Sequence, residues 1–249
     1  PICGNCDGLV LRFFETDALD ERFFSFYLPQ HPESTLRQLA REGGFEQLDD
    51  LPRLRRDLRA AFPDIWDWLR GLPTILETEH LVFVHGGIPS LDHMDRLERW
   101  GCMKNDDFMG QGRSFSKWVI VGHWPVTLYH PDIPSAAPII LPERKIISID
   151  GGCVLKADGQ LNALMLPSEE SESFTWTAWD GLPVYAALDG QEGSADSVNI
   201  RWGRSALELV EEGEETSLCR HLETGRVLPI LNRYLRRGPQ GLWCEDSTD

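Results

Sequence analysis

Hydrophobic and polar residues follow a helical periodicity through the first part of the chain. Apolar positions recur at intervals of about three and four residues, and Asp, Pro or Gly stands where a helix would begin or end. This pattern predicts helices over residues 8–14, 19–28, 33–41, 51–61 and 63–70. Leu54, Leu58, Ile65 and Leu69 share one helical stripe. We interpret that stripe as core, because such stripes usually pack against other elements.

From Thr78 onward the pattern changes to short apolar runs that are typical of buried strands. They lie over residues 81–84, 117–121, 145–149 and 161–166, and residues 1–3 have the pattern of a strand end. Asp158-Gly159 predicts a hairpin between residues 153–156 and 161–166. Helices that lead into buried strands predict an α/β or α+β fold, in which a sheet is flanked by helices.

The chain changes character after an acidic linker at residues 168–173. Strands are predicted over residues 198–202, 206–211, 216–221 and 227–231, with glycines between them. This spacing is typical of a small β-barrel, and residues 228–235 resemble the last strand and helical turn of SH3-like barrels. We therefore expect two domains, residues 1–167 and residues 175–249.

The net charge and the cysteines indicate which partners, which cellular location and which metal site to expect. The 249 residues carry a formal net charge of −16, which disfavours binding to nucleic-acid phosphates. We see no apolar run long enough for a transmembrane helix and no signal peptide, so no membrane partner is expected. The six scattered cysteines favour reduced thiols and a cytoplasmic location. Cys3 and Cys6 form a C-x-x-C pair, but a structural zinc site would need a second pair.

Three candidate metal ligands each follow a glycine or end a strand. His85 ends the apolar run at residues 81–84, His123 follows Gly122 after the next run, and Asn5 follows Gly4. Each has an ordinary structural explanation, since Asn5 is a suitable helix cap and His123 a suitable core histidine. Taken together they predict a site at the C-terminal edge of one sheet. Imidazole and amide oxygen are ligands for a hard or borderline divalent metal.

These motifs, in this order, resemble the later motifs of calcineurin-like metallophosphoesterases of the phosphoprotein phosphatase type. The resemblance rests on Gly4-Asn5-Cys6-Asp7, His85-Gly86-Gly87 and Gly122-His123-Trp124, followed by the segment 149–154 and the strand 161–166. It spans residues 1–167. It is closest to bacterial serine/threonine phosphatase-like members and to symmetrical diadenosine tetraphosphatases.

The resemblance implies two divalent ions, manganese, iron or zinc, that clamp a phosphoryl group for in-line attack by hydroxide. Asn5, His85 and His123 match ligands of the second metal. Asp7 matches the carboxylate that orients the residue before it. The substrate would be a phosphorylated protein or a small phosphate ester.

Two features depart from the family pattern. The family's first two motifs, an Asp-x-His and a Gly-Asp, should lie upstream of Gly4, so we expect this chain to lack the N-terminal part of its domain and to be inactive by itself. Cys6 stands where phosphoprotein phosphatases usually carry a His that protonates the leaving oxygen. We therefore expect a preference for leaving groups that need no protonation.

Three functional hypotheses remain open from the sequence. The first is a metal-dependent phosphoesterase, with protein serine/threonine phosphatase as one option. The second is a nucleotide hydrolase of the symmetrical diadenosine tetraphosphatase kind. The third is a non-catalytic scaffold that uses the SH3-like barrel for interactions. No oligomeric state follows from the pattern.

Overall fold

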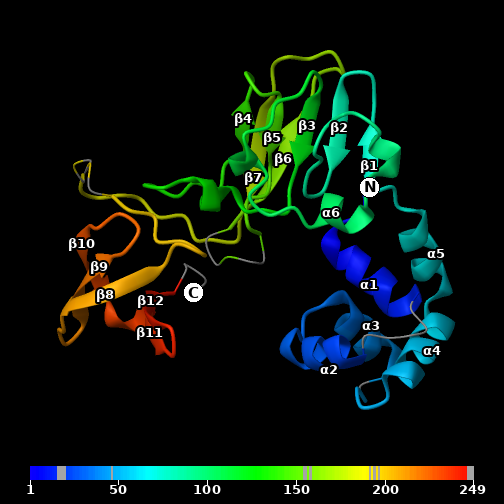
Figure 1. The fold of residues 1–249 in the computed structure, drawn as a ribbon, viewed down its shortest axis with the longest axis horizontal. Helices are drawn as coiled ribbons and strands as arrows, with labels where there is room; N and C mark the ends of the chain where they lie inside the picture. The colour runs from blue at the N-terminus through cyan, green and yellow to red at the C-terminus, as the bar shows by residue number, and fades with distance from the viewer. Residues whose placement is uncertain are drawn as a thin grey trace. The chain divides into compact units, whose positions relative to one another are not determined.

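The computed structural model describes residues 1–15, 21–45, 47–153, 156, 159–190, 192, 195 and 197–245. These residues form a mixed α/β protein (Figure 1). The chain divides into two compact units. The first consists of Pro1–Phe108 and Arg113–His123, and the second of Met109–Gly112 and Trp124–Asp249.

The predicted helices are confirmed, with shifted ends except at residues 51–61, where the bounds agree. The α-helices of the described residues are α1 Asn5–Glu15, α2 Glu21–Gln30, α3 Thr35–Gly43, α4 Leu51–Ala61, α5 Pro63–Gly71 and the short α6 Arg99–Met103. α1 begins earlier than predicted because the Asp7 carboxylate accepts a hydrogen bond from the Gly4 backbone N–H, as in a capping box. Asp50 caps α4 by accepting from the Arg53 N–H at 2.9 Å. Gly44 caps the C-terminal end of α3, and its left-handed φ of 74° suits glycine.

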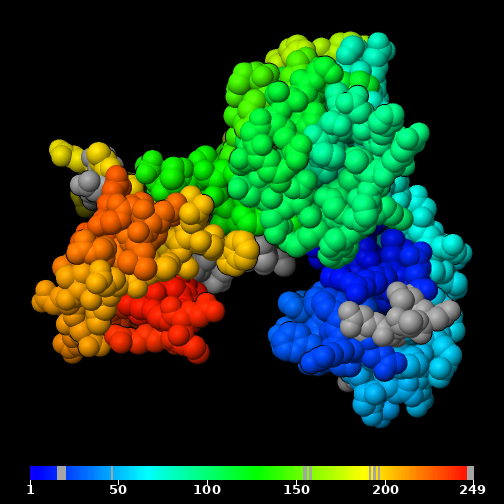
Figure 2. Space-filling view, viewed as in Figure 1, coloured from blue at the N-terminus to red at the C-terminus, as the bar shows by residue number. Residues whose placement is uncertain are grey.

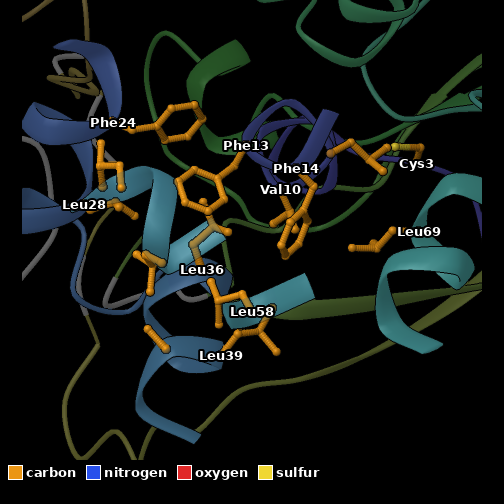
Figure 3. Packing of buried hydrophobic residues seen from close by; sticks show 14 of the residues in the cluster. Cys3, Val10, Phe13, Phe14, Phe24, Leu28, Leu36, Leu39, Leu58 and Leu69 are labelled. Atoms are coloured by element: carbon orange, nitrogen blue, oxygen red, sulfur yellow. The ribbon is translucent and has the colours of Figure 1, made fainter. Parts of the chain in front are cut away.

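The helices bury one large hydrophobic cluster in the first unit. Phe13 lies between Phe14, also of α1, and Phe24 of α2 (Figure 3). Its ring centroid is 5.1 Å from that of Phe24 in an edge-to-face contact. Phe14 makes a similar contact with Trp66 of α5, at 5.0 Å. The helices also lie against one another in the space-filling view, where they are blue to cyan (Figure 2). The apolar stripe predicted from the sequence is therefore largely core, with Leu54, Leu58 and Leu69 buried.

The strands after the helices form a mixed sheet of order β1-β2-β3-β5-β4. Its strands are β1 Ile75–Glu77, β2 Leu81–Val84, β3 Trp118–Val121, β4 Ile139–Leu141 and β5 Ile146–Ser148. β2 and β3 run parallel, with Leu81 opposite Trp118. The remaining short helices are the 3₁₀ turns η1 Met94–Arg96, η2 Met109–Gln111, η3 Val126–Tyr129 and η4 Asn232–Tyr234.

The expected strand end at residues 1–3 is wrong. The Cys3 N–H donates to the Pro73 carbonyl at 2.8 Å, but these residues belong to no strand. The helical cap at Gly4 follows directly and directs the chain into α1.

The second unit contains two further antiparallel sheets. β6 Leu161–Met165 pairs with β7 Thr175–Trp179, so the predicted strand at 161–166 has its partner across the acidic linker. The other sheet has the order β10-β9-β8-β12-β11. Its strands are β8 Ala206–Glu211, β9 Thr216–His221, β10 Val227–Leu231, β11 Leu235–Gly238 and β12 Gly241–Cys244.

The expected closed barrel is corrected by this topology. Three of its strands, β8, β9 and β10, are confirmed at their predicted bounds, but no sheet of the described residues closes into a barrel. Residues 198–202 form no strand and contribute only an isolated bridge between Arg201 and Arg204. The predicted turn at Asp158 lies outside the described residues.

Within the described ranges, no helix has both the length and the apolar character needed to cross a membrane.

Candidate metal centre

Two parallel strands bring the candidate histidines together. His85 follows the last residue of β2, and His123 comes two residues after the end of β3. Because the strands are parallel, their C-terminal ends lie at the same edge of the sheet. The Gly122 N–H donates to the His85 carbonyl at 2.9 Å, which extends the pairing beyond the strands. The two imidazole ring centroids are 5.2 Å apart.

The start of α1 brings Asn5 to the same place. Asn5 Oδ1 is 2.8 Å from His85 Nε2, a hydrogen-bond distance, so the amide oxygen and the imidazole predicted as ligands lie side by side. Gly4 allows this approach, since a Cβ at that position would lie 3.2 Å from atoms of the His85 ring. Asp7 fixes the start of the helix through its hydrogen bond to the Gly4 N–H, at 2.9 Å. Its predicted role in orienting Cys6 stays a prediction.

Gly86 and Gly87 bring a further segment against His85. Both of their N–H groups donate to the Cys102 carbonyl, at 2.8 and 3.1 Å. A Cβ on Gly86 would lie 2.8 Å from the Met103 carbonyl oxygen and 2.9 Å from the Asn105 backbone nitrogen. Only glycine allows the backbone to pass this closely, so the Gly-Gly pair positions the turn that follows α6.

That turn supplies two charged residues that the sequence analysis missed. Asp106 Oδ1 is 2.8 Å from His123 Nε2 and 2.5 Å from Lys104 Nζ. Lys104 Nζ is 3.3 Å from the same His123 nitrogen. The His123 side chain is 8% exposed, whereas those of Lys104 and Asp106 are about two-fifths exposed. Their only sequence signal is a short charged segment after α6, which is also typical of a solvated turn.

Opposing effects act on the Asp106 carboxyl. Burial acts to raise its pKa, but hydrogen bonds and charge interactions with Lys104 and His123 outweigh that effect and lower the pKa. Asp106 is therefore a carboxylate at neutral pH, suited to accept hydrogen bonds from both neighbours.

Cys6 lies beside the candidate ligands, on the first turn of α1. It is exposed, and Asn5 Nδ2 lies 3.9 Å from its sulfur. Desolvation by neighbouring protein atoms and the charge of Asp7 both raise the pKa of the thiol. In the metal-free chain Cys6 therefore holds its proton on Sγ at neutral pH.

Asn5, His85 and His123 bring together donor types that suit a divalent ion. An amide oxygen and two imidazoles are ligands that manganese, iron and zinc accept, and the Asn5 and His85 side chains contact each other. The part of the chain that the structure describes contains no group of three or more His, Cys, Asp or Glu placed to hold an ion.

No protein-family model, curated protein or solved structure matches this chain.

Proposed function

We propose that this chain carries one metal position of a metal-dependent phosphoesterase, with Asn5, His85 and His123 as its ligands. The observation that carries the proposal is the meeting of Asn5 Oδ1 and His85 Nε2 at 2.8 Å, with the His123 ring 5.2 Å from that of His85. The three residues are far apart in the sequence and come from a helix start and two strand ends. Core packing alone does not require two imidazoles and an amide at one sheet edge.

The proposed chemistry divides between the ion and the chain. A divalent ion bound there supplies Lewis-acid polarisation of a phosphoryl oxygen. His85 and Asn5 hold their donor atoms in place through the strand end and the capped helix start. Cys6 holds a proton on Sγ, but a thiol forms weak and poorly directed hydrogen bonds to a leaving oxygen. We therefore propose aryl phosphates and phosphoanhydrides as better substrates than the alkyl oxygen of phosphoserine.

The proposal extends to the fold and its setting. The parallel strands β2 and β3, each followed by a motif histidine, support a metallophosphoesterase sheet, and the first motif begins helix α1 beside His85. The turn η4 after β10 supports an SH3-like chain path, in an open sheet. We assign the protein to the cytoplasm, in keeping with its free cysteines.

Cobalt binding to the metal-free 249-residue chain tests the metal position. We expect one Co²⁺ ion per chain, detected by its visible absorption and by calorimetry. His85→Ala and His123→Ala should each weaken binding at least tenfold. His80→Ala is the matched control, because His80 lies just before the opposite end of β2, and it should leave binding unchanged.

The same samples test the reaction. With Asn5, His85 and His123 proposed as ligands for one ion where the reaction uses two, the chain should turn over 4-nitrophenyl phosphate negligibly with Mn²⁺ or Co²⁺. Binding that survives both histidine substitutions would overturn the proposed metal position. Rapid turnover that survives them would overturn the assignment of these residues to the reaction.

A further inference from the structure

The turn after α6 contacts one candidate ligand from the outside. Asp106 Oδ1 lies 2.8 Å from His123 Nε2, a normal length for a charge-assisted hydrogen bond. The same oxygen lies 2.5 Å from Lys104 Nζ. Asp106 therefore has two neighbours at hydrogen-bond distance on a single oxygen, and they come from its own turn and from the end of β3.

The distances indicate which atom carries the proton. Lys104 is an ammonium and only donates, so a bond from Lys104 to His123 would require Nε2 without a proton. An unprotonated Nε2 would then set its lone pair against the Asp106 carboxylate at 2.8 Å, which is repulsive. The Lys104–His123 distance of 3.3 Å is also the longest of the three. Nε2–H donating to Asp106 satisfies all three groups, with Lys104 donating to the same oxygen.

We propose that Asp106 is a positioning residue that holds His123 with its proton on Nε2 and thereby leaves Nδ1 as the donor atom for a metal ion. A histidine presents a lone pair on only one ring nitrogen when it is neutral, and the partner of the other nitrogen decides which one. Carboxylates commonly hold metal-binding histidines in this way. Lys104 lies 2.5 Å from the same Asp106 oxygen and so fixes which oxygen accepts from His123.

The backbone supports this arrangement. His123 has a φ of 66°, in the left-handed region that few non-glycine residues occupy. Its side chain is 8% exposed, so the ring has little room to reorient. Gly86 and Gly87 hold the turn of Lys104 and Asp106 close to His85 through the Cys102 carbonyl. The carboxylate therefore reaches His123 from a backbone that is itself fixed.

The first measurement needs no metal. The metal-free chain should show a ¹H–¹⁵N resonance from the His123 Nε2–H, protected from exchange and assigned by its loss in His123→Ala. Asp106→Ala should remove that protection. Asp106→Asn should restore it in part, because an amide oxygen still accepts. Asp107→Ala is the matched control, since it removes the same charge one residue along.

The second measurement rests on the proposed function. Asp106→Ala should weaken Co²⁺ binding about 10- to 100-fold, while Asp107→Ala leaves it unchanged. An unchanged Co²⁺ affinity in Asp106→Ala, together with its loss in His123→Ala, would overturn the positioning role and leave the metal position standing. No Co²⁺ binding to any variant would overturn the proposed function instead. A resonance assigned to Nδ1–H in the metal-free chain would overturn the tautomer in either case.

Discussion

The helical part of the first unit and the sheet β8–β12 of the second unit differ mainly in how many apolar side chains they bury. The helices enclose a cluster of buried apolar residues that contains Phe13, Phe14 and Phe24. The sheet β8–β12 encloses a cluster of four, which are Leu207, Cys219, Ile230 and Cys244. Buried apolar area is the main favourable term in folding, so the helical core should contribute far more stability.

The candidate metal ligands depend on the larger of these cores. Asn5 is the first residue of α1, whose other residues include Val10, Phe13 and Phe14, all deep in the helical cluster. A ligand is held accurately when the element that carries it is packed on several sides. We therefore expect the candidate site and most of the folding stability to belong to the first unit. The following substitutions test this expectation.

Phe13→Ala should have the largest effect on stability. Phe13 is fully buried, and its loss leaves a cavity between Phe14 and Phe24. We expect a loss of about 3–5 kcal/mol in the free energy of unfolding of the first unit, measured by urea denaturation. Phe26→Ala is the matched control, because Phe26 of α2 is 68% exposed, and should change little. Equal losses in the two variants would contradict the assignment of the core.

Gly86→Ala should come next, because the obstacles to a Cβ there are backbone atoms. The Met103 oxygen and the Asn105 nitrogen lie 2.8 and 2.9 Å from the added carbon, so the turn of Lys104 and Asp106 must move. We expect a loss of about 3 kcal/mol, at the upper end of overpacking effects, together with weaker Co²⁺ binding. Gly71→Ala is the control, since a Cβ there meets no atom within 4 Å. Unchanged Co²⁺ affinity in Gly86→Ala would show that the turn does not support the site.

Leu207→Ala tests the smaller core. Leu207 is 4% exposed in the sheet of the second unit, and we expect a loss of about 2 kcal/mol in the stability of that sheet. The Co²⁺ affinity should not change, because the candidate ligands all belong to the first unit. Leu222→Ala removes an exposed side chain and serves as the control. A weaker Co²⁺ affinity in Leu207→Ala would show that the two regions are not separable in this way.

Local chemistry explains which elements were predictable from the sequence. The helix at residues 51–61 was predicted at its observed bounds because Pro63 marks the start of the next helix. The structure adds the cap that Asp50 forms at its beginning. β8, β9 and β10 were equally predictable, since glycines separate them. The partner of β6 was not predictable, because strand pairing across the linker depends on tertiary contacts that periodicity does not encode.

The candidate site divides in the same way. Asn5, His85 and His123 were found because each stands next to a glycine at the end of an apolar run or the start of a helix. Lys104 and Asp106 were missed because their contact with His123 depends on how Gly86 and Gly87 hold the turn after α6. No spacing rule connects Asp106, in the turn after α6, to a histidine that follows β3. The barrel expectation failed for a related reason, since closure depends on pairing between sheet edges and not on strand spacing.

The smallest predicted effect is on the pH dependence of stability, and it comes from two separate buried thiols, Cys102 in the first unit and Cys219 in the second. Burial and the charge of Glu98 both raise the pKa of Cys102 in the first unit. Burial also raises the pKa of Cys219 in the second unit, but Arg237 acts against that shift. A raised pKa means that the folded state binds more protons than the unfolded state. The stability from each thiol is therefore fully present below about pH 8.5, where an unfolded thiol titrates, and is lost as the pH rises through the folded pKa.

The two thiols should differ in how steeply stability falls with pH. Between pH 8 and 10, with reductant present, the thermal midpoint of the first unit should fall less in Cys102→Ala than in the original chain. Cys219→Ala should reduce the corresponding fall for the second unit by a smaller amount, because Arg237 stabilises the Cys219 thiolate in the folded state. Each variant serves as the control for the other unit. If the thermal midpoint falls equally with pH in Cys102→Ala and in the original chain, the Cys102 thiol has the same pKa in the folded and unfolded states. That result would contradict the predicted effect of its burial.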